Sequence, residues 1–279
     1  MPLRVVPPTG TGVTSIARSV TGLGPCAVPS PPDSFQDLGF ARADTGRLAR
    51  TGDAEVIYGE GKTAEQVVTL VSALRAAHPD HPVMVTRAAA PMRAAVVDAF
   101  AESTVDDDGQ VVAIGALPQA RGEVCVVSAG TSDAAVAAEA AFVARVFGAG
   151  VTRVRDVGVA GVHRLLAVRD VLDAADCLIV VAGMDGALPS AVGGLTGVPL
   201  VAVPTSVGYG ASFGGVAALL AMLNSCAPGV VVCNIDNGFG AGVFAARVAR
   251  RARPRTPEVS VHPRTPEVSV HPRTPEAAS

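Results

Sequence analysis

The feature that most constrains this fold is the regular alternation of short apolar runs with alanine-rich stretches across residues 121–252. Runs that are apolar at nearly every position are typical of strands buried on both faces, and their alternation with helical stretches is typical of a parallel sheet. The sequence therefore predicts a doubly wound α/β domain that binds its ligand at the carboxyl ends of the strands. The five runs are VCVVS (124–128), VTRVRDV (151–157), CLIVVA (177–182), PLVAVP (199–204) and VVVCNI (230–235).

A smaller α/β domain is predicted to precede it, over residues 33–120. Thr63 and Gln66 have the spacing of a capping box, which marks the first turn of a helix. The run Asp106-Asp107-Asp108-Gly109 indicates a turn before VVAIG; its carboxylates could bind a metal or simply face solvent. The expected strands are 55–59 and 82–87, and the expected helices run from Thr63 to about Ala77 and over 90–102.

The two ends of the chain differ from the middle. Residues 1–32 are rich in proline, glycine and serine, which predicts a disordered N-terminal segment. The nine residues PRTPEVSVH occur at 254–262 and again at 263–271. Two prolines in each repeat cannot continue a helix, so residues 253–279 are predicted to form an extended tail.

Composition and charge exclude several classes of protein. The formal net charge is −3 and no basic stripe stands out, so no nucleic-acid partner is expected. No apolar run approaches the roughly 18 residues of a membrane helix, and the N-terminus is unlike a signal peptide. The five cysteines are odd in number and include no CxxC pair, which argues against a disulfide scaffold or a zinc ribbon and favours a cytoplasmic location.

A glycine-rich polar loop follows each predicted strand of the second domain. The first loop leads into a helix, where backbone N–H groups suit a phosphate, although Ser132 or Asp133 could equally be an ordinary N-cap. Five such loops on one edge of a sheet favour a substrate site. Neither GxGxxG nor GxxxxGK[ST] is present, so the standard dinucleotide and triphosphate motifs are missing. The loops span 128–133, 156–164, 182–190, 204–212 and 234–240.

Three residues in or between these loops have more than one possible interpretation. His163 is the only histidine of the second domain, and it could have a structural role or contact substrate. Asp185 lies between two glycines and could be a base, a metal ligand or a helix cap. Cys226, in LLAMLNSCAPGVVV, could fill a gap in the packing or act as a nucleophile. The cysteines inside apolar runs are interpreted as core residues; they are Cys125, Cys177 and Cys233.

These loops carry a resemblance to known families. SAGTSD, the His163-Arg164 pair and an AG…LP loop resemble the PurE class of carboxyaminoimidazole ribonucleotide mutases. A closer resemblance is to the LarB family of nickel-pincer cofactor biosynthesis, and it extends over residues 33–250. DLGFARADTGR (37–47) and EVIYGEGKT (55–63) resemble the N-terminal domain of that family. The LarB-like motifs of the second domain are AGTSD, DVGVAGVHRLL, VVAGMDGALPS, VPTSVGYGASFGG, AMLNSCAPG and NIDNGFGA.

The LarB resemblance implies a PurE-like fold for the second domain and a specific reaction. Members carboxylate the pyridinium ring of nicotinic acid adenine dinucleotide and hydrolyse its phosphoanhydride, which gives pyridinium-3,5-biscarboxylic acid mononucleotide and AMP. The carboxyl donor is CO2 or bicarbonate, and a divalent metal, Mg2+, assists. Both families imply a higher homo-oligomer assembled through the PurE-like domain.

The resemblance also implies roles for individual residues. It makes Cys226 the nucleophile that adds to the ring, because sulfur is both a good nucleophile and a good leaving group. Asp185 would remove the ring proton, where the family pattern has the longer Glu, and His163 would orient the substrate or the carboxyl donor. Asp236 is a candidate for a ribose or metal contact. The expected substrate-binding residues are Gly130, Thr131, Ser132, Asp133, Arg164, Gly183, Met184, Gly186, Thr205, Ser206, Gly208, Tyr209, Ser225, Asp236, Arg42, Arg47 and Lys62.

Two alternatives remain open from the sequence. The first is a PurE-type mutase, although such mutases are typically a single short domain that lacks the segment before residue 121. The second is a nucleotide-binding module without catalytic activity. Turnover of a dinucleotide would distinguish the LarB reaction from both.

Overall fold

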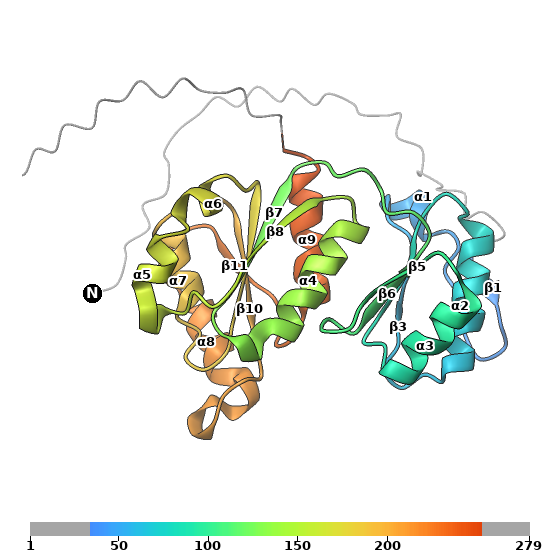
Figure 1. The fold of residues 1–279 in the computed structure, drawn as a ribbon, viewed down its shortest axis with the longest axis horizontal. Coiled ribbons are helices and arrows are strands. Elements are labelled where there is room, and N and C mark those ends of the chain that lie inside the picture. Colours follow the sequence, from blue (N-terminus) through green and yellow to red (C-terminus); the bar gives the residue numbers. More distant parts are fainter. Residues whose placement is uncertain (1–33, 253–279) are drawn as a thin grey trace, which may run out of the picture.

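The protein is described here by a computed structural model that covers residues 34–252. The expectations for the N-terminal segment and for the repeat tail lie outside the described residues. The described chain forms two α/β domains, each with its own main sheet (Figure 1). Within this part of the chain, no helix has the length and apolar character needed to cross a membrane.

The C-terminal domain contains a five-stranded sheet in which every strand pair is parallel. The strand order is β11-β10-β9-β7-β8, so the chain winds in one direction from β7 to β8 and in the other from β9 to β11. This confirms the doubly wound fold and places its switch point between β7 and β9. The strands are β7 (Glu123–Ser128), β8 (Gly150–Val154), β9 (Cys177–Ala182), β10 (Leu200–Pro204) and β11 (Val230–Val232).

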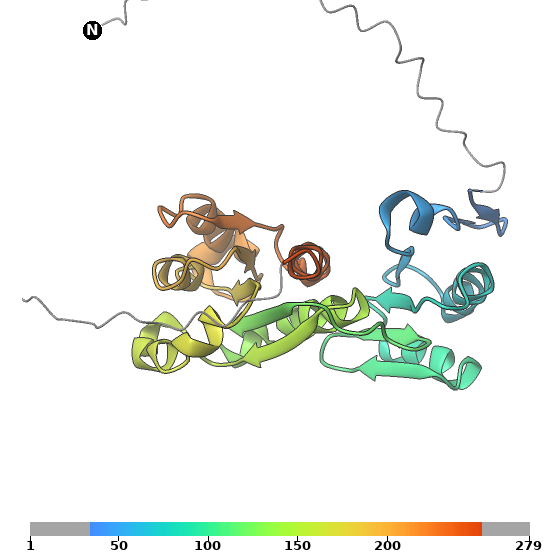
Figure 2. The ribbon, with the colours of Figure 1, turned by 90° about the horizontal axis from the view of Figure 1, so that it is seen from above.

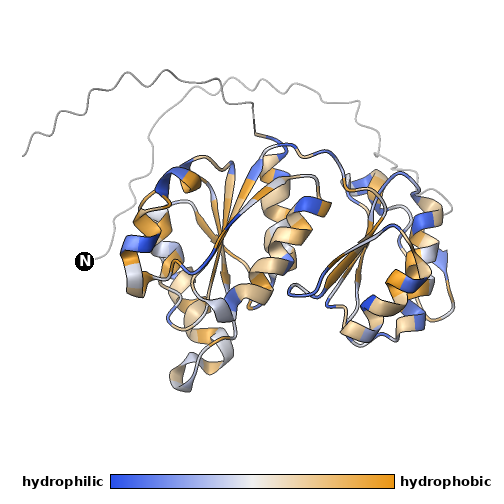
Figure 3. Ribbon diagram, viewed as in Figure 1, coloured by the Kyte–Doolittle hydropathy of each residue, from blue (hydrophilic) through white to orange (hydrophobic). Residues whose placement is uncertain are grey.

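Helices cover both faces of this sheet. Side chains alternate along each strand, so that Ile179 packs beneath α4 and α9 while Leu178 packs beneath α5 to α8. Figure 3 shows the resulting pattern, with hydrophobic strands inside and hydrophilic residues on the outer helices and loops. The helices are α4 (Ala134–Val146), α5 (Val162–Leu166), α6 (Arg169–Asp173), α7 (Leu188–Gly193), α8 (Val216–Leu223) and α9 (Gly238–Ala249), with short 3-10 turns η1 (Thr131–Asp133), η2 (Val159–Gly161) and η3 (Gly210–Gly215).

The N-terminal domain has a mixed four-stranded sheet in the order β3-β4-β6-β5. The strand β3 is parallel to β4, while β6 is antiparallel to both of its neighbours. The predicted capping box is present, since Thr63 accepts a hydrogen bond from the Gln66 amide and Gln66 bonds back to the Thr63 amide. The elements are β1 (Gln36–Asp37), β2 (Arg42–Ala43), α1 (Arg47–Thr51), β3 (Val56–Tyr58), α2 (Ala64–Ala77), β4 (Val83–Thr86), α3 (Ala90–Ala99), β5 (Ser103–Asp106) and β6 (Val111–Ile114).

Several predicted boundaries are wrong. The helix predicted over 90–102 ends at Ala99, because Phe100 adopts an extended conformation and the chain turns into β5. That edge strand escaped prediction because Val105 is its one apolar residue. The strands predicted over 151–157 and 230–235 end at Val154 and Val232, where the backbone leaves the sheet for the loops.

The two domains share one hydrophobic core. Helices α2 and α3 cover one face of the N-terminal sheet. The other face presents Met84, Val111 and Ala113, which pack in a single cluster with α4 and α9 of the C-terminal domain. Figures 1 and 2 show α4 beside the N-terminal strands, so this helix has a sheet on each side of it.

Helices α4 and α9 approach each other closely at two glycines. A Cβ atom on Gly242 would lie 2.7 Å from the Ala140 carbonyl oxygen and 2.7 Å from the Val143 Cβ, and one on Gly238 would lie 2.5 Å from the Val136 carbonyl oxygen. Backbone atoms cannot move away as a flexible side chain can. Glycine at these positions is therefore required by the helix crossing.

We expect Gly242→Ala to lower the free energy of unfolding by about 1–3 kcal/mol, although alanine is the better helix former, because the added methyl overpacks the crossing. The matched control is Gly197→Ala, where a Cβ meets nothing within 4 Å. Urea unfolding of both variants gives the comparison. Equal stability of the two would contradict the close helix contact.

Candidate active site

A cavity of about 900 Å³ opens at the carboxyl edge of the five-stranded sheet. Its walls come from the loops after β7, β8, β9 and β10, which is the switch point where doubly wound folds bind ligands. Figure 1 shows the lower end of the sheet, where these loops gather beside η3 and α8. The lining residues are Ala129, Gly130, Ser132, Asp133, Gly158, Val159, Ala160, Ala182, Gly183, Met184, Asp185, Leu188, Val207, Gly208, Tyr209, Ala211, Ser212 and Ala217.

The loops after β7 and β10 contact each other beyond the carboxyl end of β9. The Thr205 hydroxyl donates a hydrogen bond to Asp133 Oδ1 over 2.8 Å, and both residues are buried. A Cβ on Gly183 would lie 2.6 Å from Thr205 Oγ1 and 2.4 Å from the Val207 carbonyl oxygen. Only glycine therefore fits at position 183, directly after β9.

Asp133 does not act as the ordinary N-cap that was one of the two roles predicted for it. Its side chain does not cap α4. Instead, Oδ2 accepts a hydrogen bond from the Gly130 amide at 2.9 Å, while Oδ1 accepts the Thr205 hydroxyl. A buried carboxylate with both oxygens satisfied, at the start of η1 and α4, is stabilised by the positive end of the helix dipole. Asp133 thereby connects the loops after β7 and β10 at the base of the cavity.

The charged side chains that line the cavity are both acidic. They are Asp133 and Asp185; no lysine, arginine or histidine is among the described lining residues. Asp185 is exposed, and its Oδ1 accepts the Ala187 amide at 3.3 Å. An acidic cavity favours a cationic group, whereas a phosphate would depend on backbone N–H groups such as those at the start of α4.

The loop that carries Asp185 is fixed on both sides. The Met184 amide donates to the Val207 carbonyl over 2.8 Å. Met184 and Gly186 both have positive φ, 54° and 62°, and a Cβ on Gly186 would lie 2.7 Å from the Ala218 carbonyl oxygen. A left-handed non-glycine residue persists only where its surroundings determine the conformation, and such residues cluster at functional sites.

The cavity brings together part of the predicted site. The predicted residues that line it are Gly130, Ser132, Asp133, Gly183, Met184, Asp185, Gly208 and Tyr209. Thr205 lies buried beneath the wall, and Thr131, Gly186 and Ser206 are neighbours of lining residues. Sequence reasoning missed the apolar part of the wall, which includes Val159, Leu188, Val207 and Ala217. Each of these four residues lies within two positions of a loop glycine, which was the available signal.

His163 and Arg164 lie outside the cavity lining. They belong to α5, one turn beyond the lining residue Ala160. His163 is exposed, and Arg164 Nη1 forms an ion pair with Asp156 Oδ2 at 2.7 Å. In the single chain, therefore, Arg164 binds the loop after β8, and neither residue lines the cavity.

Asp236 forms hydrogen bonds with the end of β10 and the loop that follows it. Its Oδ1 accepts the Ser206 amide at 2.8 Å, and its own amide donates to the Pro204 carbonyl at 2.9 Å. Within residues 34–252, no group of three or more His, Cys, Asp or Glu side chains could hold a metal ion. In the triple-aspartate run, Asp106 Oδ1 accepts the Gly109 amide at 2.9 Å, as a turn requires.

Cys226 lies at the opposite edge of the sheet from the cavity. Helix α8 starts beside the cavity at Ala217 and runs back to the strand origins, where Val230 pairs with Leu200, the first residue of β10. Cys226 precedes Val230 and is exposed. Its neighbour Ser225 shares a 2.8 Å hydrogen bond with Ser190 of α7.

The three basic residues predicted to reach the adenylate are apart from one another. Arg42 forms a 3.6 Å ion pair with Asp37. Arg47 contacts Asp44 and Glu55 before β3, whereas Lys62, after β3, donates to the Tyr58 carbonyl over 2.7 Å. The first two are therefore separated from Lys62 by the length of that strand.

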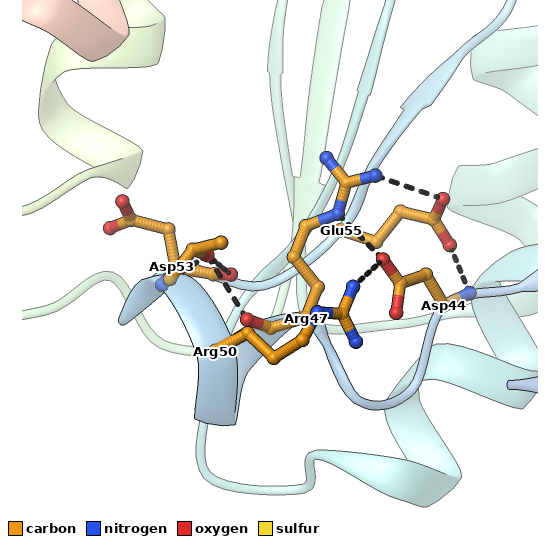
Figure 4. A network of polar contacts seen from close by, with 6 residues as sticks. Asp44, Arg47, Arg50, Asp53 and Glu55 are labelled. Atoms are coloured by element: carbon orange, nitrogen blue, oxygen red, sulfur yellow. Dashed lines mark hydrogen bonds and ion pairs between the residues drawn. The ribbon is translucent and has the colours of Figure 1, made fainter. Parts of the chain in front are cut away.

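Arg47 belongs to the polar network of Figure 4. Burial opposes ionisation of Asp44, but hydrogen bonds from Arg50 and Arg47 outweigh it and lower the pKa of that carboxyl. The Asp53 carboxylate points away from these arginines (Figure 4) and pairs instead with Arg247 and Arg250 of the C-terminal domain, at 2.7 and 2.9 Å. Asp53 thus joins the two domains at the amino edge of the large sheet.

A second cavity, of about 390 Å³, lies at that junction. Asp53, Glu55, Arg121, Phe147 and Arg250 are among the residues that line it. The amino-terminal side of a parallel sheet is not where such folds place their chemistry. The cavity at the carboxyl edge is therefore the candidate active site.

Comparison with known proteins agrees with the two-domain architecture. Residues 35–116 match the LarB/PurE-like N-terminal domain model, and residues 123–261 match the AIR carboxylase model. An uncharacterised protein of Methanocaldococcus jannaschii, MJ0165, is 47% identical over 131 residues, which are 46% of this chain and 50% of that protein. The chain thus spans about half the length of this curated relative.

A solved structure is also similar. The crystal structure of a PurE2 variant from Treponema denticola is 25% identical, with a TM-score of 0.37, over 46% of this chain and 79% of that one. The two domain models, found in this order on one chain, match the LarB architecture. The chain therefore belongs to the LarB family, in which a LarB/PurE-like N-terminal domain precedes an AIR carboxylase domain.

Proposed function

We propose that this protein carboxylates the pyridinium ring of nicotinic acid adenine dinucleotide and hydrolyses its phosphoanhydride, giving pyridinium-3,5-biscarboxylic acid mononucleotide and AMP. The family supports a carboxylase-type role. The choice of a pyridinium substrate is carried by one observation, the acidic lining of the cavity at the switch point.

The cavity favours a cationic ring over a free phosphate. Both charged side chains in its described lining are carboxylates. A quaternary ring nitrogen near them is stabilised by opposite charge, and the apolar wall that includes Leu188 and Val207 accepts the flat ring faces. The phosphate end of the substrate would then lie at the start of η1 and α4, where Gly130 and Ser132 line the cavity.

The proposed chemistry explains why a thiol is needed. A cationic ring cannot attack CO2. The Cys226 thiolate adds to ring carbon 4, the C=N+ electron pair moves to nitrogen, and the ring becomes a neutral dihydropyridine. Ring carbon 5 is now the nucleophilic carbon of an enamine. It forms a bond to CO2, whose displaced electron pair becomes the new carboxylate charge.

Aromaticity is restored in two further steps. A base removes the proton from carbon 5, and the nitrogen electron pair then expels the thiolate from carbon 4. The net change is one CO2 consumed and one proton released. Asp185 suits the base because it is exposed, lines the cavity and belongs to a loop fixed by backbone contacts on two sides. His163 and Arg164, which lie outside the lining of their own chain, would orient substrate only at its outer rim.

Cys226 does not line the cavity of its own chain, so its proposed role needs a second copy of the chain. Within one chain the thiol and the cavity lie at opposite edges of the sheet. Beside the thiol, Val216, Leu220 and Leu223 share one face of α8 and are 41%, 56% and 62% exposed. Apolar side chains at this spacing form a stripe that a partner would cover. We propose that a homo-oligomer buries this stripe and brings Cys226 to a neighbour's cavity.

Magnesium remains part of the proposal without a protein site. The described residues offer no cluster of ligands around Asp236. The ion would have to arrive on the pyrophosphate of the substrate, as Mg2+ commonly does. No step above depends on it, and no residue is assigned to the hydrolytic half of the reaction.

The variant Cys226→Ala tests the proposed nucleophile. We expect it to lose activity by at least about a thousandfold, because without the thiol the ring stays electron-poor. Intact mass spectrometry with nicotinic acid adenine dinucleotide, bicarbonate and magnesium should detect an adduct on the wild type alone. Chromatography should detect AMP and the doubly carboxylated mononucleotide.

Cys233→Ala is the matched control, because removal of this half-buried thiol should leave activity unchanged. Full activity of Cys226→Ala would make the thiol a packing residue. If wild type instead converted a carboxyaminoimidazole ribonucleotide and ignored the dinucleotide, a PurE-type mutase would replace this proposal. Binding without turnover would favour the inactive module.

A further prediction tests the shared site. Cys226→Ala and Asp185→Asn should each be inactive alone. The two variants are then unfolded together and refolded as mixed oligomers. Each site needs Cys226 from one chain and Asp185 from its neighbour, and each residue is intact in half of the chains. Random assembly should therefore restore about a quarter of the wild-type activity. An inactive mixture would mean that both residues must come from one chain.

Another prediction concerns the remaining thiols. Burial raises the pKa of both Cys125 and Cys177 to about 12, so neither is a thiolate at neutral pH. Among the four described cysteines, iodoacetamide should therefore label Cys226 first in the folded protein, and should label the buried pair only after unfolding. Peptide mapping gives the order of labelling. Early labelling of Cys125 would contradict the packing of β7.

A further inference from the structure

Arg87 reaches from the N-terminal domain into the C-terminal domain. It follows β4, and its Nε and Nη2 donate to Glu139 Oε1 and Oε2 of α4 at 3.0 and 3.3 Å. Nη2 also donates to the backbone carbonyl of Asp236. One guanidinium thus holds a helix and a loop of the other domain at the same time.

The guanidinium is held firmly. Glu139 is 2% exposed and also accepts the Thr86 hydroxyl at 2.5 Å, so it is a buried carboxylate with several partners. Removing one partner of such a group is costly, because a buried charge is left without compensation. The Arg87 backbone has a φ of 53°, a left-handed conformation that only a well-determined environment maintains.

The Asp236 loop carries this contact to the cavity. Asp236 also has a positive φ, 55°. Its amide bonds to the Pro204 carbonyl and its Oδ1 accepts the Ser206 amide at 2.8 Å. The next residue, Val207, lines the cavity and accepts the Met184 amide at 2.8 Å. Hydrogen bonds and the chain between Ser206 and Val207 therefore connect Arg87 with the loop after β10 and, through it, with the loop that carries Asp185.

We infer that Arg87 is a positioning residue through which the N-terminal domain sets the shape of the cavity wall. It does not line the cavity, and it acts through the Asp236 carbonyl on the loop that begins at Thr205. The inference deepens the proposed function and rests on it for the kinetic test alone. The contact at the other edge, Asp53 with Arg247, joins the same two domains, and no hydrogen bond described in residues 34–252 carries it on to the cavity.

This difference supplies a matched pair of variants. Arg87→Lys and Arg247→Lys make the same substitution, and each weakens one interdomain ion pair. Arg87→Lys keeps the charge but loses the forked geometry that spans Glu139 and the Asp236 carbonyl. A role limited to holding the domains together would give both variants the same effects.

The first measurement is amide hydrogen exchange in the full chain. A hydrogen bond to a charged group is worth enough that its loss should speed local opening by about tenfold or more. We expect Arg87→Lys to speed exchange in segments 204–209 and 234–237 by this factor, and Arg247→Lys to change them by less than about twofold. Equal changes in the two variants, or no change in either, would overturn the inference.

The second measurement separates binding from chemistry. With nicotinic acid adenine dinucleotide as substrate, Arg87→Lys should raise KM by about tenfold and change kcat by less than about threefold, because the wall moves while the reacting groups remain. Faster exchange with unchanged kinetics would show that Arg87 does not position the site. If wild type does not turn over this substrate, the proposed function fails, and the exchange data still decide the coupling.

Glu139→Gln provides the test if Arg87→Lys does not fold. The amide keeps the shape of the carboxylate and still accepts from Thr86, but it no longer attracts the guanidinium. We expect faster exchange in the same two segments, by a smaller factor. Faster exchange confined to residues 83–96 would assign Arg87 to the N-terminal domain alone and overturn the inference.

Discussion

Helix α4 is the element on which the rest of the structure depends, because it is buried from two sides. The large sheet and α9 pack on one side of it, and Met84, Val111 and Ala113 of the small sheet pack on the other. Such a helix has little room for large side chains, which explains its run of alanines. It also explains why α9 carries glycines where the two helices cross. The small sheet is thereby covered on both faces, so its strands β4 and β6 are buried throughout.

This arrangement gives the domain interface two polar ends around an apolar middle. At the amino edge of the large sheet, the buried Asp53 binds two arginines at the C-terminal end of α9. At the carboxyl edge, the buried Glu139 binds Arg87. Buried carboxylates need such partners and lose much free energy without them, so each pair fixes orientation more than it adds stability. In the described part of the chain, the second end continues, through Asp236, into loops that line the cavity.

The sequence was informative where one local pattern decides the structure. Apolar runs predicted all five strands of the large sheet, and the glycine-rich loops after them predicted the edge where the cavity opens. Asp133 illustrates the limit of that reasoning. A polar residue before a helix suggests a cap or a ligand contact, but its partner Thr205 follows a strand two positions away in the sheet. Arg87 escaped prediction for the same reason, since Asp236 is 149 residues further along the chain.

The chemistry of Cys226 depends on its surroundings. The residue follows the C-terminal end of α8, where the helix dipole disfavours an anion. It is exposed to water, which solvates a thiolate, but it does not line the cavity of its own chain. In the proposed assembly the same thiol enters a cavity lined by two carboxylates. The cationic ring of the proposed substrate would offset the charge of these carboxylates and attract the sulfur. On this view the thiol becomes nucleophilic only when neighbouring chain and substrate are both in place, so assembly and catalysis depend on the same contact.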